Sequence, residues 1–319
     1  MNISTFSRQK GLSLIELMVG LALASVLLLG VLQIFDANRR THLLQESLSR
    51  IQESGRIATD MLAKELRNAA FTGCVVDNEF LIDHLGTVGD YISGIDNATA
   101  QTAAIGGAEV LVGTDVLTVK GAFDACGGKG RISTNLGGNV IELTESCGLV
   151  VGQEVLIANC NAGDYTRVQE ISGSAPMVML TAEHGLGADY GPEAKVYRYY
   201  ARTYFISRSG NLPGLYVSEN GGAARELVPG IEDLQVRYGR ASQTPEIVDI
   251  WGEPPINSAE SEQVAAVRVQ LLVAADERIG ANQFEYTPLG GELTQSADDG
   301  RLRKVYSVLS KVRNRGNIK

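Results

Sequence analysis

The sequence predicts an α+β protein in which one long N-terminal helix packs against an antiparallel β-sheet domain. Three observations carry this prediction. Residues 12–70 contain no proline, residues 12–35 are almost wholly apolar, and the rest of the chain alternates short apolar runs with glycine-rich turns. The helix therefore has a membrane half and an amphipathic half, and we expect a large β-rich insertion in the sheet domain at about residues 105–200.

The composition is that of an ordinary globular protein with an acidic balance. The chain has 319 residues, of which 44% are hydrophobic and 20% charged, and its formal net charge is -9. It has no long basic run, so it lacks the electrostatic footprint of a nucleic-acid-binding protein. We expect no nucleic-acid partner.

The apolar segment at residues 12–35 is long enough to cross a bilayer, since a helix rises about 1.5 Å per residue against a hydrocarbon core of roughly 30 Å. Glu16 is its one charged residue. A cleavable secretory signal would be cut near Ala22-Leu23-Ala24, but this would leave an exposed apolar tail. A plain signal anchor leaves Glu16 unexplained. The residue needs an explanation because a carboxylate within a membrane helix costs roughly 2.5–3.5 kcal/mol.

The segment from Lys10 to Leu23, KGLSLIELMVGLAL, resembles the class III signal of type IV prepilins. The resemblance implies that a prepilin peptidase removes residues 1–11 by cutting between Gly11 and Leu12, and that the new amine of Leu12 is methylated. Glu16 then becomes the fifth residue of the mature chain, the position at which the family has its glutamate. The family's usual aromatic first residue is replaced by leucine here.

The charges near the new N-terminus suggest a role in assembly. An ammonium group on Leu12 and the Glu16 carboxylate each need a counter-charge in a low-dielectric setting. In a helix bundle, Glu16 of one subunit could neutralise the amine of its neighbour and so set the axial stagger. The alternative is that Glu16 only interacts with the positive end of its own helix dipole.

The charges that flank the apolar segment leave its orientation open. Arg8 and Lys10 precede it, and Arg39 and Arg40 follow it. A periplasmic C-terminal domain is therefore implied by the leader and by the cysteines.

The helix is predicted to continue through residues 36–70 as an amphipathic segment. Its apolar residues recur at spacings of three, four or seven, and charged residues occupy the other faces. The apolar residues are Leu44, Leu48, Ile51, Ala58, Leu62 and Leu66. Gly30 and Gly55 are the expected weak points. A short dimeric coiled coil is the alternative for this segment.

The globular domain, residues 71–319, is predicted to be rich in antiparallel strands after an unassigned polar stretch at residues 71–107. The first strands are expected within residues 109–123, 139–146, 149–160, 165–172, 177–183, 194–207 and 214–220.

Near the C-terminus, a Gly-Ile-Glu-Asp turn at residues 230–233 leads into a strand that ends in Tyr238-Gly239. A valine-rich strand follows at residues 264–277, and the final strand ends in Arg-Asn-Arg at residues 313–315. In this order the segments resemble the C-terminal half of the PilW family of minor pilins.

The four cysteines, Cys74, Cys126, Cys147 and Cys160, form no C-x-x-C pair. Behind a membrane-targeting segment, an even number favours two disulfides over four free thiols. All three pairings are open. We favour Cys147 with Cys160, because Gly152 could turn two short strands back on each other, which leaves Cys74 to pair with Cys126.

No catalytic motif occurs, and we expect neither an enzyme nor a bound cofactor or metal. Asp298-Asp299-Gly300 is typical of a turn, with a calcium site as the alternative. Four tyrosines are close together in the sequence and fit cross-strand packing better than a carbohydrate platform. They are Tyr197, Tyr199, Tyr200 and Tyr204.

The resemblance implies a minor pilin that primes assembly of a type IV pilus and stays at or near its tip. It further implies a single-pass protein of the inner membrane that later becomes part of an extracellular fibre. Its partners would be other minor pilins, the major pilin, the prepilin peptidase, the inner-membrane assembly platform and a tip adhesin. The alternatives are a minor pseudopilin of a type II secretion system and a membrane-anchored periplasmic binding protein or enzyme.

Overall fold

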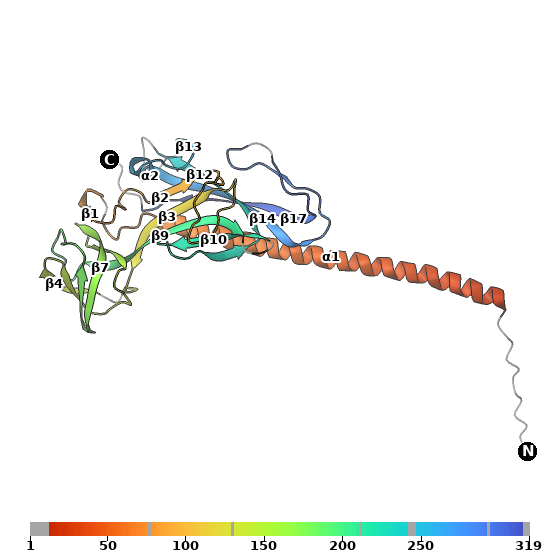
Figure 1. Cartoon of the computed structure of the whole chain (residues 1–319), viewed down its shortest axis with the longest axis horizontal. Helices are drawn as coiled ribbons and strands as arrows, with labels where there is room; N and C mark the ends of the chain where they lie inside the picture. Colours follow the sequence, from red (N-terminus) through yellow and green to blue (C-terminus); the bar gives the residue numbers. More distant parts are fainter. Residues whose placement is uncertain are drawn as a thin grey trace, which may run out of the picture.

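The computed structural model describes residues 13–75, 78–128, 131–208, 210, 212–241, 247–291 and 294–314. A single long helix, α1 (Leu14–Asn68), runs into a β-rich domain, and its N-terminal half projects away from that domain (Figure 1). The predicted α+β class, a long helix packed on antiparallel sheets, is confirmed.

Helix α1 begins at the N-cap Ser13, whose side chain accepts a hydrogen bond from the Glu16 backbone N–H. It passes through both Gly30 and Gly55 without interruption, so neither glycine breaks it. A stripe at helical spacing is buried against the sheet domain. The stripe comprises Ser47, Ile51, Gly55, Ala58, Leu62, Ala63 and Leu66.

Within the described residues, a four-stranded antiparallel sheet packs directly on this stripe. Its order is β13 (Ile250–Gly252), β12 (Ile231–Arg240), β14 (Val264–Arg278) and β17 (Arg301–Lys311). Leu234 pairs with Leu271 and Val236 with Val269, and these side chains share one core with α1. The alternate residues of β12, Asp233, Gln235 and Arg237, therefore lie on the opposite face, which we call the outer face.

The other strands of the described residues form a branched eleven-stranded sheet and a two-stranded one. β9 is the hub of the larger sheet, pairing with β3, β6 and β10. The bounds are β1 (Leu81–Asp83), β2 (Ile92–Ile95), β3 (Val116–Asp124), β4 (Ile132–Gly137), β5 (Val140–Leu143), β6 (Glu154–Ala158), β7 (Gly163–Ser174), β8 (Met177–Ala182), β9 (Lys195–Arg208), β10 (Pro213–Glu219) and β11 (Arg225–Pro229). β15 (Glu285–Tyr286) pairs with β16 (Thr294–Gln295), and the short helices are η1 (Asn78–Phe80) and α2 (Ser258–Glu262).

Strands β4 to β8 build a lobe with its own apolar core, which includes Ile132, Ile141 and Leu180. The lobe lies at the end of the molecule opposite the helix N-terminus (Figure 1). The four clustered tyrosines of β9 are at most 7% exposed and pack within the sheets, as cross-strand packing predicts. They form no open carbohydrate platform.

The favoured disulfide pairing is wrong. Cys74 pairs with Cys160 and Cys126 with Cys147, at Cα–Cα distances of 4.7 and 4.6 Å. Residues 149–159 contain one strand, β6, and not the expected hairpin. Cys147 and Cys160 therefore lie beyond opposite ends of β6, which alone spans about 16 Å, whereas disulfide Cα atoms are usually 4.4–6.8 Å apart.

Candidate functional site

The first half of α1 is the clearest candidate for a functional surface. Its large apolar side chains between residues 14 and 35 are 51–78% exposed, so the protein's own domain does not cover them. Among the described helices, α1 alone is long and apolar enough to cross a membrane, judged by length and composition. This surface therefore needs lipid or other helices around it.

Glu16 lies in the first turn of α1 and is exposed. There it interacts favourably with the positive end of the helix dipole whatever else it does. Gly11 and Leu12, the predicted processing residues, lie outside the described residues. The cleavage, the methylation and the registry role of Glu16 thus stay predictions.

Polar contacts hold the second half of α1 on the sheet domain, and the sequence analysis did not predict them. Arg202 of β9 donates to both carboxylate oxygens of Glu65 at 2.9 Å and to Glu219 of β10 at 2.8 Å. Its guanidinium also lies over the Tyr200 ring, 4.4 Å from the centroid. This arginine fixes the last turns of the helix to β9 and β10.

The closing Arg-Asn-Arg segment also holds the helix end. The Asn314 amide donates to the carbonyls of Arg67 and Ala69 at 3.4 and 3.3 Å, and Ser310 Oγ donates to the Ala63 carbonyl. The Asn314 amide thereby satisfies the Arg67 carbonyl, one of those that a helix C-terminus leaves without intrahelical partners. Arg315 lies outside the described residues.

The Gly-Ile-Glu-Asp turn positions charges on the outer face. Gly230 has φ +80° and a Cβ there would lie 2.8 Å from the Ala274 carbonyl oxygen, so the turn requires glycine. Glu232 accepts two hydrogen bonds from Arg303, whose side chain is 1% exposed. The same arginine donates to Asp299 and lowers the pKa of that carboxyl to about 2.

The Asp298-Asp299-Gly300 segment is thus a turn whose Asp299 is engaged by arginine. Within the described residues, no group of three or more His, Cys, Asp or Glu side chains could hold a metal ion.

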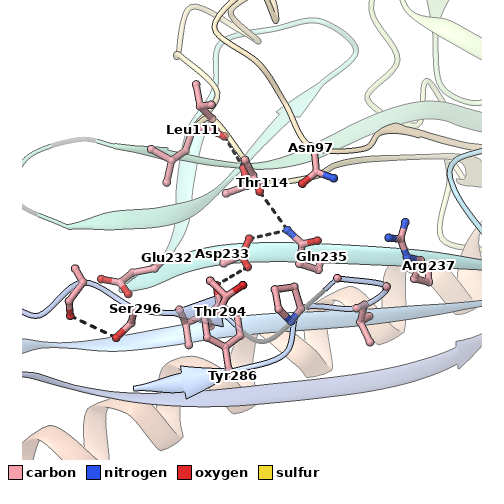
Figure 2. A pocket seen from close by; sticks show the side chains of 18 residues that line it. Asn97, Leu111, Thr114, Glu232, Asp233, Gln235, Arg237, Tyr286, Thr294 and Ser296 are labelled. Carbon is pink, nitrogen blue, oxygen red and sulfur yellow. Dashed lines mark hydrogen bonds between the residues drawn. The ribbon is translucent and has the colours of Figure 1, made fainter. Parts of the chain in front are cut away.

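A polar pocket of about 480 Å³ lies on the outer face of the sheet, beneath the connection from β14 to β17. Figure 2 shows Gln235 and Tyr286 directed toward Asp233 from opposite sides. The Gln235 amide donates to Asp233 Oδ1 at 3.0 Å, and the Tyr286 hydroxyl donates to Oδ2 at 3.1 Å. Burial raises the pKa of Asp233, despite the hydrogen bonds that lower it.

Two family models match the chain at its two ends. Residues 203–314 match PilW, the type IV pilus-assembly protein W, and residues 6–32 match the prokaryotic N-terminal methylation motif. Over residues 203–314 the chain is similar to PilW. The PilW match covers β10 to β17, the part that packs on α1 and forms the pocket floor, and the β4–β8 lobe lies outside it.

No curated protein matches the chain. Among solved structures, it is similar to a type IV-like pilin, TTHA1219 from Thermus thermophilus, with 14% identity and a TM-score of 0.38. That match covers 84% of this chain and 98% of the other. PilW is a family of pilus-assembly proteins and not of enzymes.

Proposed function

We propose that this PilW-like chain is a minor pilin of a type IV pilus. A prepilin peptidase cuts it between Gly11 and Leu12. Residues 12–35 then hold it in the inner membrane, with residues 71–319 in the periplasm, until it enters the extracellular fibre. One observation carries the proposal: a single helix joins an uncovered apolar half to a half packed on its own domain, with Glu16 beside the end that is cut.

The apolar half of α1 needs lipid or similar helices around it. Each large apolar side chain that leaves water contributes about 1.5–3 kcal/mol, so this half cannot leave lipid unless similar helices replace the lipid contacts. A bundle of such helices gains contacts by sliding into register, and pairing of Glu16 with a neighbouring Leu12 amine selects one register.

The proposed role is to prime assembly with other minor pilins and to stay near the tip. Its partners are the major pilin, the inner-membrane assembly platform and a tip adhesin. The β4–β8 lobe supports a distal position, because it lies farthest from the membrane half of α1 (Figure 1). On this proposal the chain is a structural subunit without catalytic activity, and a type II secretion pseudopilin is the nearest alternative.

Replacing Glu16 with alanine tests the proposal. We expect Glu16→Ala to enter the membrane as the wild type does, because removing a charge does not oppose insertion. Its recovery with partner pilins in a pull-down should fall by roughly tenfold or more, because the neighbouring amine loses its counter-charge. Glu46→Gln is the matched control, since it neutralises a helix acid whose described ion pair is with Arg50 of the same helix. Normal incorporation of Glu16→Ala would contradict the registry role.

A further inference from the structure

We propose that the pocket on the outer face binds an aliphatic cation, an alkyl chain that ends in an ammonium or guanidinium group, and that Asp233 is the counter-charge. The site is separate from the helix surface that the proposed function uses. Its recognition chemistry follows from the charges and walls of the pocket.

The floor of the pocket holds a buried carboxylate that lacks a cationic partner. Asp233 is 8% exposed, and the hydrogen bonds described to its carboxylate come from the neutral groups of Gln235 and Tyr286. Among the described residues, no lysine, arginine or histidine forms an ion pair with it. Burying an unpaired charge is costly, which is why its pKa is raised. A cation in the pocket would supply the missing partner.

The arginines beside the pocket are already neutralised. Arg237 pairs with Asp96 at 2.9 Å and with Glu253 at 2.7 Å. At the other end, Arg303 is held by Glu232 and Asp299. Neither guanidinium is therefore available to bind an anion, and the local balance of charge is negative.

The walls suit an alkyl stem. Leu272 of β14, the 111–112 turn and Pro288-Leu289 of the β14–β17 connection line the pocket around its polar floor. Lysine and arginine characteristically bury their methylene stems along apolar surface while the charged end meets a polar partner. The volume lies within the usual range for ligand pockets, roughly 300–1,000 Å³.

The connection that covers the pocket contacts the sheet at several points. The Tyr286 hydroxyl reaches Asp233, Gln270 donates to the Thr287 carbonyl, and Gly290 lies against the Arg237 guanidinium. Gly290 has φ +77°, and a Cβ at this position would overlap Arg237. The opening beside Asp233 is therefore a built feature of the fold.

The test is a ligand-observed NMR titration of the full mature chain in detergent micelles. The probe is Nα-acetyl-L-lysine N-methylamide, and its neutral match is the norleucine analogue. We expect saturable binding of the lysine probe, at least about tenfold tighter than that of the norleucine probe. This comparison uses the wild-type chain alone, so its result is independent of any effect of a substitution on folding. Equal binding of the two probes, or no binding of either, would overturn the proposal.

Two variants locate the site. Asp233→Asn keeps the shape and an acceptor for the neutral donors, and should weaken lysine binding about tenfold or more. Glu170→Gln, which neutralises an exposed acid of β7, should bind as the wild type does. Unchanged binding by Asp233→Asn would overturn the assignment, as would binding of maltose without binding of the lysine probe. A second probe, n-butylammonium, distinguishes two sources of the cation. If it binds as tightly as the lysine probe, the natural ligand is a free amine; if it binds more weakly, the natural ligand is a polypeptide side chain.

Discussion

Gly55 lies on the buried stripe of α1, directly beneath the ring of Tyr306 in β17. A Cβ at this position would overlap the ring. The absence of a side chain therefore lets the strand approach the helix closely. At Gly30, in the uncovered half of the same helix, a Cβ would have nothing from outside its own helix turn within 4 Å. The two glycines have the same helix propensity and opposite surroundings.

This contrast gives a matched pair of substitutions. Gly55→Ala should lower the free energy of unfolding by about 1–3 kcal/mol, because overpacking at Tyr306 outweighs the roughly 1 kcal/mol by which alanine favours a helix. Gly30→Ala should leave it unchanged or raise it slightly. Denaturant unfolding of both variants in micelles checks this, and equal stability of the two would contradict the packing role of Gly55.

Asp115 makes the stability of the domain depend on pH. Its carboxylate accepts from the Asn97 and Val236 backbone N–H groups, and burial raises its pKa to about 6. An unfolded aspartate titrates near 3.9, so the folded state holds this proton up to higher pH. Protonated Asp115 therefore contributes to the free energy of unfolding. This contribution, at most about 3 kcal/mol, is fully present below about pH 4 and is lost as pH rises through 6.

Between pH 4 and 7, unfolding measurements should show a smaller loss of stability in Asp115→Asn than in the wild type, and the remaining loss includes that of Asp233, whose pKa burial also raises. Asp299 is the control of opposite sign. Its pKa is lowered to about 2, so its contribution is present above about pH 4 and is lost between pH 4 and 2. In Asp299→Asn, the dependence of the unfolding free energy on pH should be unchanged above pH 4 and weaker below it. An unchanged slope above pH 4 in Asp115→Asn would contradict the role of Asp115.

At the scale of elements, sequence periodicity predicted which residues of a helix or strand lie on its buried face. Of the predicted stripe, Ile51, Ala58, Leu62 and Leu66 are buried as expected, because helical spacing sets which residues share a face. Leu44 and Leu48, at 39% and 37% exposed, lie on the same stripe where the sheet only begins to cover the helix. Strand β14 likewise buries Val267, Val269 and Leu271 on one face. These features are visible within a single segment.

Features that depend on contacts between distant segments escaped prediction. The predicted disulfide pairing is wrong because residues 149–159 do not fold into a hairpin. Their one strand, β6, pairs with β9, which lies about forty residues further along the chain. The pocket was missed because residues 286–291 return over β12 without any periodic pattern. The Gly230–Asp233 motif was recognised, but nothing in it revealed that Tyr286 would contact Asp233.

The disulfide pairing can be checked by mapping peptides from unreduced protein. Trypsin leaves Cys147 and Cys160 on one peptide, so a glutamyl endoprotease that cuts after Glu154 is needed as well. We expect linked peptides containing Cys74 with Cys160 and Cys126 with Cys147. A linked Cys147–Cys160 peptide would contradict the fold described for the β4–β8 lobe.

Removing one disulfide should affect its own region of the fold. A Cys126→Ser, Cys147→Ser double variant opens a loop with a sequence separation of 21 and should lose about 3 kcal/mol of unfolding free energy. Hydrogen exchange should place the loss in β4, β5 and β8, and leave the α1 core protected. Loss of protection throughout the chain would show that the lobe is not a separate unit of stability.

At the scale of the whole molecule, α1 divides the protein between two environments. Its second half shares a core with β12, β14 and β17, whereas its first half carries apolar side chains that nothing in the described structure covers. On the proposed function, this division lets one chain be retained by a membrane and then packed into a fibre. Both proposed roles depend on processing at the few residues of the N-terminus.

Mass spectrometry of the mature N-terminus, in cells that assemble fibres, tests that account most directly. The account predicts a chain that starts at Leu12, with one methyl group on its amine. A start at Ser25 would indicate an ordinary secreted protein. A chain that keeps its first eleven residues would contradict the central claim.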